Sequence, residues 1–120
     1  MIGTLDGVVL DCPDPRALAD SYRQLLGGRV DQGSQDWATL TGTSTIDLGF
    51  QRSPGHRAPT WPGGGANGQQ LHLDVLVTDL DDAHAQVLAL GATLLDESLD
   101  HASLRVFADP AGHPFCLVTD

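Results

Sequence analysis

The feature that most constrains the fold of this chain is an internal repeat. Residues 7–26 (GVVLDCPDPRALADSYRQLL) align without a gap with residues 72–91 (HLDVLVTDLDDAHAQVLALG), at an offset of 65 residues. Each copy reads as an apolar strand, a turn that contains an aspartate, and a helix that meets a glycine. The two copies share a chain of 120 residues, which leaves no room for a second full domain, so the repeat predicts one domain built from two equivalent modules.

The helix of each copy has recognisable start and stop signals. Asp14 is a predicted N-cap ahead of Pro15, and Gly27 ends the first helix. Thr78 or Asp79 caps the second helix, which ends before Gly91. Apolar residues at helical spacing indicate the faces that pack inward; they are Leu18, Tyr22 and Leu25 in the first copy and Leu80, Ala83, Val87, Leu88 and Leu90 in the second.

Further strand candidates follow each helix, at Val30, 37–40 and 45–51 in the first half and at 93–95, 104–108 and 115–118 in the second. The element order is therefore βαβββ twice, which predicts an α+β fold. We expect a single domain over 1–120, with module one at about 1–52, a connector at 53–70 and module two at 71–120. The connector is rich in glycine and proline, which is typical of a flexible crossover or of a loop that closes over a site.

The composition narrows the range of partners. Six basic residues against 16 acidic ones give a formal net charge of −10, which repels nucleic acid and anionic membranes. The sequence has no apolar run of about 18 residues and no basic start followed by an apolar stretch, so we expect a cytoplasmic protein. Cys12 and Cys116 lie far apart without CxxC spacing, and we interpret both as reduced and buried.

The duplicated βαβββ order, the segment DLDDAHAQVLALGA (79–92) and the closing DPAGHPFCL (109–117) together resemble the vicinal oxygen chelate superfamily. This group contains glyoxalases, bleomycin resistance proteins and extradiol dioxygenases, and the likeness is strongest to actinobacterial glyoxalase-like domains. It spans residues 7–117. The resemblance implies that the modules form a concave mixed sheet with helices on the outer face and a cleft for a small molecule, and that the protein is a homodimer.

The resemblance also implies a divalent metal held by four side chains, two from each module. Carried over to this sequence, the four positions fall on Gly7, Asp47, His72 and Cys116. Only His72 matches the family pattern, because Gly7 has no side chain, Cys116 replaces a glutamate, and Asp47 is shorter than glutamate. We therefore expect no metal cofactor. A zinc site on His72, Asp47 and Cys116 is the alternative, since these residue types suit that ion.

His72 and Asp74 are two residues apart on a predicted strand, so both face away from Leu73 and Val75. If the helix covers the apolar face, the pair lines the cleft, either as an acid–base or ligand-orienting pair or as a histidine satisfied by its neighbour. Asp11 shares the corresponding face of the first strand, where Gly7 leaves room for an organic ligand.

Five further side chains belong to the expected site or its surroundings. Arg52, next to Gln51, either reaches the cleft to pair with an anionic ligand or stays solvated at its rim. We interpret Trp37 as core packing and Trp61 as a lid or dimer contact, since a PTWP stretch recurs in similar glyoxalase-like proteins. His84, early in the second helix, is expected to be exposed. The predicted ligand-binding set is His72, Asp74, Asp11, Asp47, Gln51, Arg52 and Trp61.

The leading hypothesis is a metal-independent protein that sequesters or modifies a hydrophobic or aromatic small molecule. A metal-dependent lyase, isomerase or dioxygenase using His72 and Asp47 is the second reading, and a non-catalytic regulatory or partner-binding module is the third. The sequence leaves open whether the protein is an enzyme.

Overall fold

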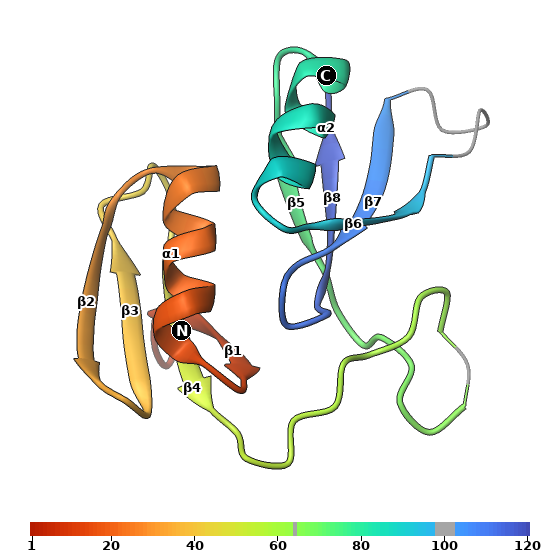
Figure 1. Ribbon diagram of the computed structural model, residues 1–120. Helices are drawn as coiled ribbons and strands as arrows, with labels where there is room; N and C mark the ends of the chain where they lie inside the picture. The colour runs from red at the N-terminus through yellow and green to blue at the C-terminus, as the bar shows by residue number, and fades with distance from the viewer. Residues whose placement is uncertain (64, 98–102) are drawn as a thin grey trace. The chain divides into compact units, whose positions relative to one another are not determined.

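The computed structural model describes residues 1–63, 65–97 and 103–120 (Figure 1). The chain divides into two compact units, Met1–His56 and Arg57–Asp120. Each unit holds one helix and one mixed sheet of four strands. The predicted α+β fold with two βαβββ modules is confirmed. The expectation of a single domain over 1–120 stays a prediction.

The first unit contains the elements β1 (Gly7–Cys12), α1 (Pro15–Leu26), β2 (Arg29–Ser34), β3 (Trp37–Thr41) and β4 (Asp47–Arg52). The strand order across the sheet is β1-β4-β3-β2. β1 pairs with β4 in parallel, and the other neighbours are antiparallel. The parallel pair places the first and last strands of the module side by side, although about 40 residues separate them in the chain.

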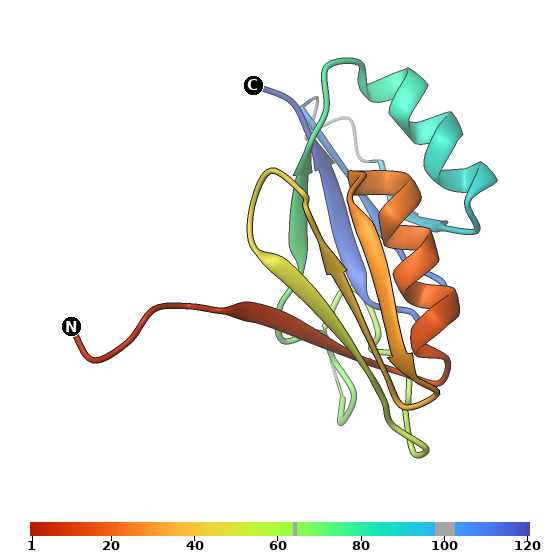
Figure 2. The same cartoon turned by 90° about the vertical axis from the view of Figure 1, so that its left-hand side faces the viewer.

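Helix α1 covers one face of this sheet (Figure 2). The side chain of Asp14 caps it by accepting a hydrogen bond from the backbone N–H of Ala17, and Gly27 ends it with a φ of +77°. The apolar stripe of the helix packs on the alternate strand residues that face it, and the rings of Tyr22 and Phe50 lie 5.7 Å apart. This core comprises Leu10, Cys12, Leu18, Ala19, Tyr22, Ala38, Leu40, Leu48 and Phe50, all buried.

The second unit repeats the plan with β5 (Leu73–Leu76), α2 (Leu80–Ala89), β6 (Thr93–Asp96), β7 (Leu104–Ala108) and β8 (Pro114–Val118). Its strand order is β5-β8-β7-β6, and β5 pairs with β8 in parallel. Asp79 caps α2, so of the two predicted caps the second is the observed one. None of the helices in the described ranges is long and apolar enough to cross a membrane.

Helix α2 has one fully buried residue, Val87, so its apolar contact with the second sheet is small. Polar contacts add to this attachment. Arg105 of β7 donates hydrogen bonds to Asp81 at 2.6 Å and to Nδ1 of His84 at 2.9 Å. The His84 ring also meets Phe107 edge to face. The expectation that His84 is exposed is therefore wrong: a cation on the neighbouring strand and an aromatic ring beneath it hold the imidazole against the sheet.

The connector from Arg57 onward folds with the second unit. The amide of Asn67 donates to the carbonyl oxygens of Arg57 and Ala58, and Ala58 packs against Gly112 in the hairpin before β8. At Gly112 a Cβ would lie 2.3 Å from that of Ala58, so glycine is required for this close approach. These contacts position the loop that carries Trp61.

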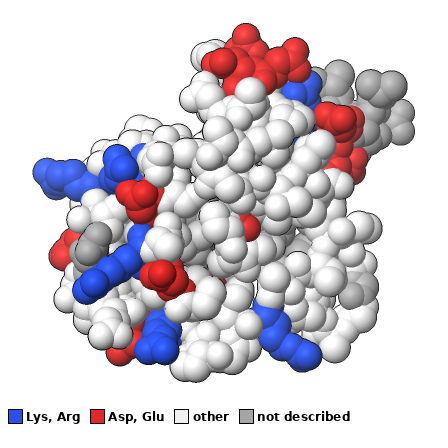
Figure 3. All heavy atoms as spheres, viewed as in Figure 1, with Lys and Arg blue, Asp and Glu red and all other residues white. Residues whose placement is uncertain are grey.

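Acidic side chains gather at the N-terminal end of α2, where Asp79, Asp81 and Asp82 lie (Figure 3). Both signs of charge are scattered over the rest of the face shown there. The expectation that neither nucleic acid nor a membrane is a partner fits the net charge of −10, and it stays a prediction.

Candidate functional site

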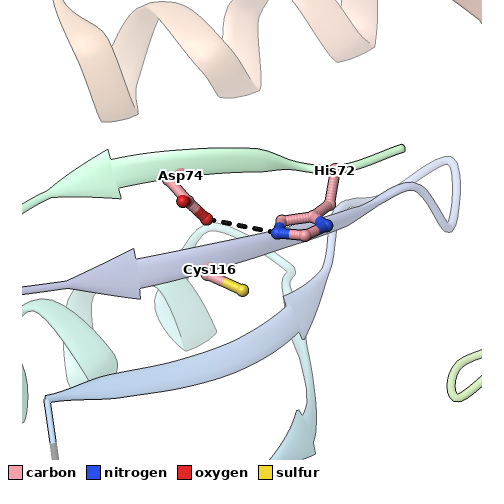
Figure 4. A group of neighbouring side chains, drawn as sticks. All are labelled: His72, Asp74 and Cys116. Carbon is pink, nitrogen blue, oxygen red and sulfur yellow. Dashed lines mark ion pairs between the residues drawn. The ribbon is translucent and has the colours of Figure 1, made fainter.

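His72, Asp74 and Cys116 form a compact cluster on the side of the second sheet that faces away from α2 (Figure 4). Asp74 and Cys116 are directly opposite each other in the parallel pair of β5 and β8. His72 precedes β5 and shares the face of Asp74, as the spacing of two predicts. Nε2 of His72 lies 3.3 Å from Oδ1 of Asp74, and one ligand atom from each of the three residues lies within 4.8 Å of the others.

The members of the cluster differ in burial. The side chains of His72 and Asp74 are 38% and 61% exposed, whereas Cys116 is only 4% exposed. Burial, together with the negative charge of Asp74 and a hydrogen bond to it, raises the pKa of the Cys116 thiol to about 11. The cysteine is therefore a neutral thiol at physiological pH. The expectation that both cysteines are buried is confirmed, and the expectation that they are reduced stays a prediction.

Trp61, in the loop ahead of β5, lies beside this cluster. Its ring centroid is 5.7 Å from that of His72, and the two rings meet edge to face at 86°. The half-buried indole thus borders the imidazole on one side, while the imidazole keeps about two fifths of its surface exposed. This contact supports a role of Trp61 at the site of His72, and its action as a lid or dimer contact stays a prediction.

In the first unit, three of the predicted side chains lie on the face of the sheet opposite α1. Asp11 and Gln51 are partners across β1 and β4, and Asp47 is the partner of Gly7 at the start of the same pair. All three side chains are exposed, in alternation with the buried residues that face the helix. Their role in ligand binding stays a prediction.

Trp37 belongs to this helix-free face. It is 37% exposed, and its indole N–H donates to the hydroxyl of Thr39 at 2.8 Å. The ring lies over Gly49, where a Cβ would come within 2.7 Å of two ring carbons. The interpretation of Trp37 as core packing is therefore wrong, because alternation along β3 turns Ala38 and Leu40 toward the helix and Trp37 away from it.

The register of the two parallel pairs also changes the correspondence between the modules. Asp74, 65 residues after Val9, lies opposite Cys116, whereas Val9 lies opposite Gly49. The counterpart of Cys116 is thus Gly49, two residues beyond the Asp47 that the family resemblance implied. At the positions that correspond to His72, Asp74 and Cys116, the first unit carries Gly7, Val9 and Gly49, which offer no side-chain donor atom.

Arg52 lies apart from the other predicted site residues of its unit. It alternates with Gln51 at the end of β4 and pairs with Asp36 at 3.5 Å. It lines a shallow hollow at the start of α1 together with Pro13, Asp14, Arg16 and Gln35. Any anionic group bound by Arg52 would meet it there, beside the carboxylates of Asp14 and Asp36, and not on the face of Asp11 and Asp47.

Comparison with known proteins connects this architecture to a family. The family model described as "Glyoxalase-like domain" matches residues 7–118, almost the whole chain. The chain belongs to the glyoxalase-like domain family. The resemblance expected from the sequence is confirmed. A comparison with curated proteins gives no match.

Three solved structures have the same fold, and one of them is described as a glyoxalase/bleomycin resistance protein/dioxygenase family enzyme. An enzyme of that family from Burkholderia phytofirmans PsJN has a TM-score of 0.73 at 20% identity, with 98% of each chain covered. The fosfomycin resistance protein FosX from Listeria monocytogenes, in complex with Mn(II) and dihydroxypropylphosphonic acid, has a TM-score of 0.71 at 13% identity, covering 98% of this chain and 90% of its own. The hypothetical protein SA1046 from S. aureus has a TM-score of 0.72 at 15% identity, with 100% and 99% covered.

The residues of this glyoxalase-like domain do not fit the four-ligand metal site that the resemblance implies. The first unit supplies glycine at both corresponding positions, and a Cβ at Gly7 would lie 3.1 Å from the carbonyl oxygen of Asp47. At Gly49 the space is already filled by Trp37. In the second unit a protonated thiol stands where the family has a carboxylate. Hard divalent ions prefer about six oxygen ligands, which this set does not provide.

Proposed function

We propose that this glyoxalase-like domain binds a small organic molecule on the helix-free face of one of its sheets, without the two-module metal site of its superfamily. The observation that carries the proposal is the exposed His72–Asp74 pair with Trp61 at its edge. Oδ1 of Asp74 lies 3.3 Å from Nε2 of His72, so the carboxylate orients the ring, and the pair can hold or transfer a proton at a ligand atom. An exposed polar pair bordered by an indole is a common composition of sites for small molecules.

The first sheet also has a helix-free face, and Trp37 indicates the character of a ligand that this face could bind. An indole that is 37% exposed, with its N–H already bonded to Thr39, offers an apolar ring surface and no donor. Such a surface favours stacking with a flat aromatic or hydrophobic compound. Asp11, Asp47 and Gln51, on the same face of the first sheet, are the polar contacts that we assign to a ligand bound on that face. We include a cytoplasmic homodimer in the proposal, and light scattering tests the dimer directly.

The test is a thermal-shift screen of chelator-treated protein against small aromatic and hydrophobic compounds. A ligand at 100 times its Kd stabilises the folded state by about 2.7 kcal/mol, which such a screen detects. For a confirmed compound, we expect calorimetry to show at least about tenfold weaker binding in Trp37→Ala or His72→Ala, as for an interface contact worth about 1.4 kcal/mol. Gln86→Ala, on the exposed side of α2, is the matched control that keeps full affinity.

Three outcomes would contradict the proposal. Binding that neither Trp37→Ala nor His72→Ala weakens places the ligand elsewhere on the protein. Turnover or binding that requires added Mn²⁺ or Mg²⁺ supports the metal-dependent lyase or dioxygenase instead. A screen without any ligand, combined with capture of a defined protein partner that purifies at fixed stoichiometry, supports the regulatory module.

A further inference from the structure

The cluster of His72, Asp74 and Cys116 combines an imidazole, a carboxylate and a thiol. We propose that these three residues form a site for a thiophilic divalent ion, Zn²⁺ by preference, within the second unit alone. The inference does not depend on the organic ligand proposed above. It also differs from the superfamily arrangement, because Asp74 is not one of the four carried-over positions and the first unit takes no part.

The distances suit a tetrahedral ion. Zinc lies about 2.0–2.2 Å from nitrogen and oxygen ligands and about 2.3 Å from sulfur, so neighbouring ligand atoms in a tetrahedral site are about 3.3–3.6 Å apart. The His72 Nε2 to Asp74 Oδ1 distance is already 3.3 Å. The widest separation in the cluster, at most 4.8 Å, must close by about 1 Å, which small side-chain rotations of the exposed His72 and Asp74 achieve.

The scaffold holds two of the three ligands in register. Asp74 and Cys116 are Cα partners in the parallel pair of β5 and β8, so backbone hydrogen bonds fix their separation. Cys116 forms the buried floor, and the other two side chains are open to solvent, which gives an ion a way in. Three protein ligands leave the fourth position to water or to a donor atom of another molecule, the pattern of zinc sites that are not closed.

The ligand types determine which ion is preferred. A thiolate is a soft ligand that selects zinc or cobalt over magnesium, calcium or manganese, which prefer several oxygens. On binding, Cys116 releases its thiol proton to solvent. The metal then lies between the sulfur of Cys116 and the carboxylate of Asp74, where that proton was. The corresponding position in the first unit is Gly49, which has no side chain to bind an ion. Of these two sets of corresponding positions, the set in the second unit is therefore the one that can hold the ion.

Titration of the full-length, chelator-treated protein with Co²⁺ tests the site. We expect one Co²⁺ per chain, with a near-ultraviolet absorption band from sulfur-to-cobalt charge transfer, and displacement of the cobalt by Zn²⁺ but not by Mg²⁺ or Mn²⁺. Cys116→Ser removes the band. Cys12→Ser is the matched control that keeps it, because Cys12 is buried in the first unit, where its thiol points at the carbonyl oxygen of Gln51.

His72→Ala and Asp74→Asn provide a second line of evidence, since both side chains are exposed and we expect the variants to keep the fold. We expect each to weaken Zn²⁺ binding at least about tenfold, the scale on which loss of supporting groups already affects metal sites. The absence of a charge-transfer band in the unmodified protein overturns the proposal. So does a band that Cys12→Ser removes and Cys116→Ser keeps, or zinc affinity that is unchanged in both His72→Ala and Asp74→Asn.

Discussion

The indole of Trp37 lies against Gly49 on the next strand, so close that a Cβ at residue 49 would come within 2.7 Å of two ring carbons and 3.2 Å of Val9. Two features of the first unit depend on this contact. It fixes the orientation of the exposed indole, and it fills the space above the residue that corresponds to Cys116.

The first prediction concerns this contact. Gly49→Ala must displace the Trp37 ring, so we expect a shift of Trp fluorescence and a loss of about 1 kcal/mol in the free energy of unfolding, measured in urea. Gly55→Ala is the control, because it has nothing within 4 Å, and it should stay within about 0.5 kcal/mol. Unchanged fluorescence in Gly49→Ala would show that the ring does not lie over Gly49.

The second prediction uses the Cys116 thiol, whose pKa is raised from 9.0 to about 11. Between these values the unfolded chain loses the thiol proton and the folded chain keeps it, so the free energy of unfolding falls as pH rises. We expect the metal-free protein to lose on the order of 2 kcal/mol more than Cys116→Ser over this pH range. Parallel stability curves for the two proteins would contradict the burial of this thiol.

The third prediction concerns the attachment of α2. Arg105→Ala removes the hydrogen bonds to Asp81 and His84, and we expect it to lower the free energy of unfolding by about 1–2 kcal/mol. Asp81→Asn keeps the contact between Arg105 and His84 and changes an exposed carboxylate, so it should cost less than about 1 kcal/mol. Equal losses in both variants would mean that the exposed ion pair, and not the His84 contact, fastens the helix.

The fourth prediction compares two glycines with positive φ angles. Gly65 has a φ of +73° and open space around it, whereas Gly112 has a φ of +92° and contacts Ala58. Gly65→Ala should cost about 1 kcal/mol from backbone strain alone. Gly112→Ala should cost about 3 kcal/mol, because the loop at Ala58 must also move. Equal stability of the two variants would show that the loop does not pack on the hairpin.

The helices and most strands could be predicted because their signals are local. Asp14 and Asp79 both cap the helices that they were expected to cap, and the strand 104–108 has the expected bounds. For strand β2 the sequence indicates only Val30, because RVDQGS has little apolar alternation. Pairing with β3 forms the strand, and the register shifts between Asp31 and Ser34. Pairing with the neighbouring strand, which apolar alternation within 29–34 does not reveal, therefore determines this strand.

Part of the candidate site could also be predicted from local spacing, and the part that depends on strand register could not. The shared face of His72 and Asp74 follows from a spacing of two, and the structure bears it out. That Cys116 completes the cluster depends on the register of β5 with β8, which no local pattern gives. For Trp37, alternation with Ala38 and Leu40 already indicated the helix-free face; the size of the indole favoured the core and outweighed that signal.

Because the architecture is duplicated, the first unit can be compared position by position with the site in the second unit. Residues 7, 9 and 49 have the same strand positions as 72, 74 and 116, in a unit whose core is closed by its own helix. Placing a histidine, an aspartate and a cysteine at these three positions would test whether the backbone geometry alone is sufficient for binding an ion. Such a graft has to begin with a smaller residue in place of Trp37, since this ring now excludes side chains from position 49.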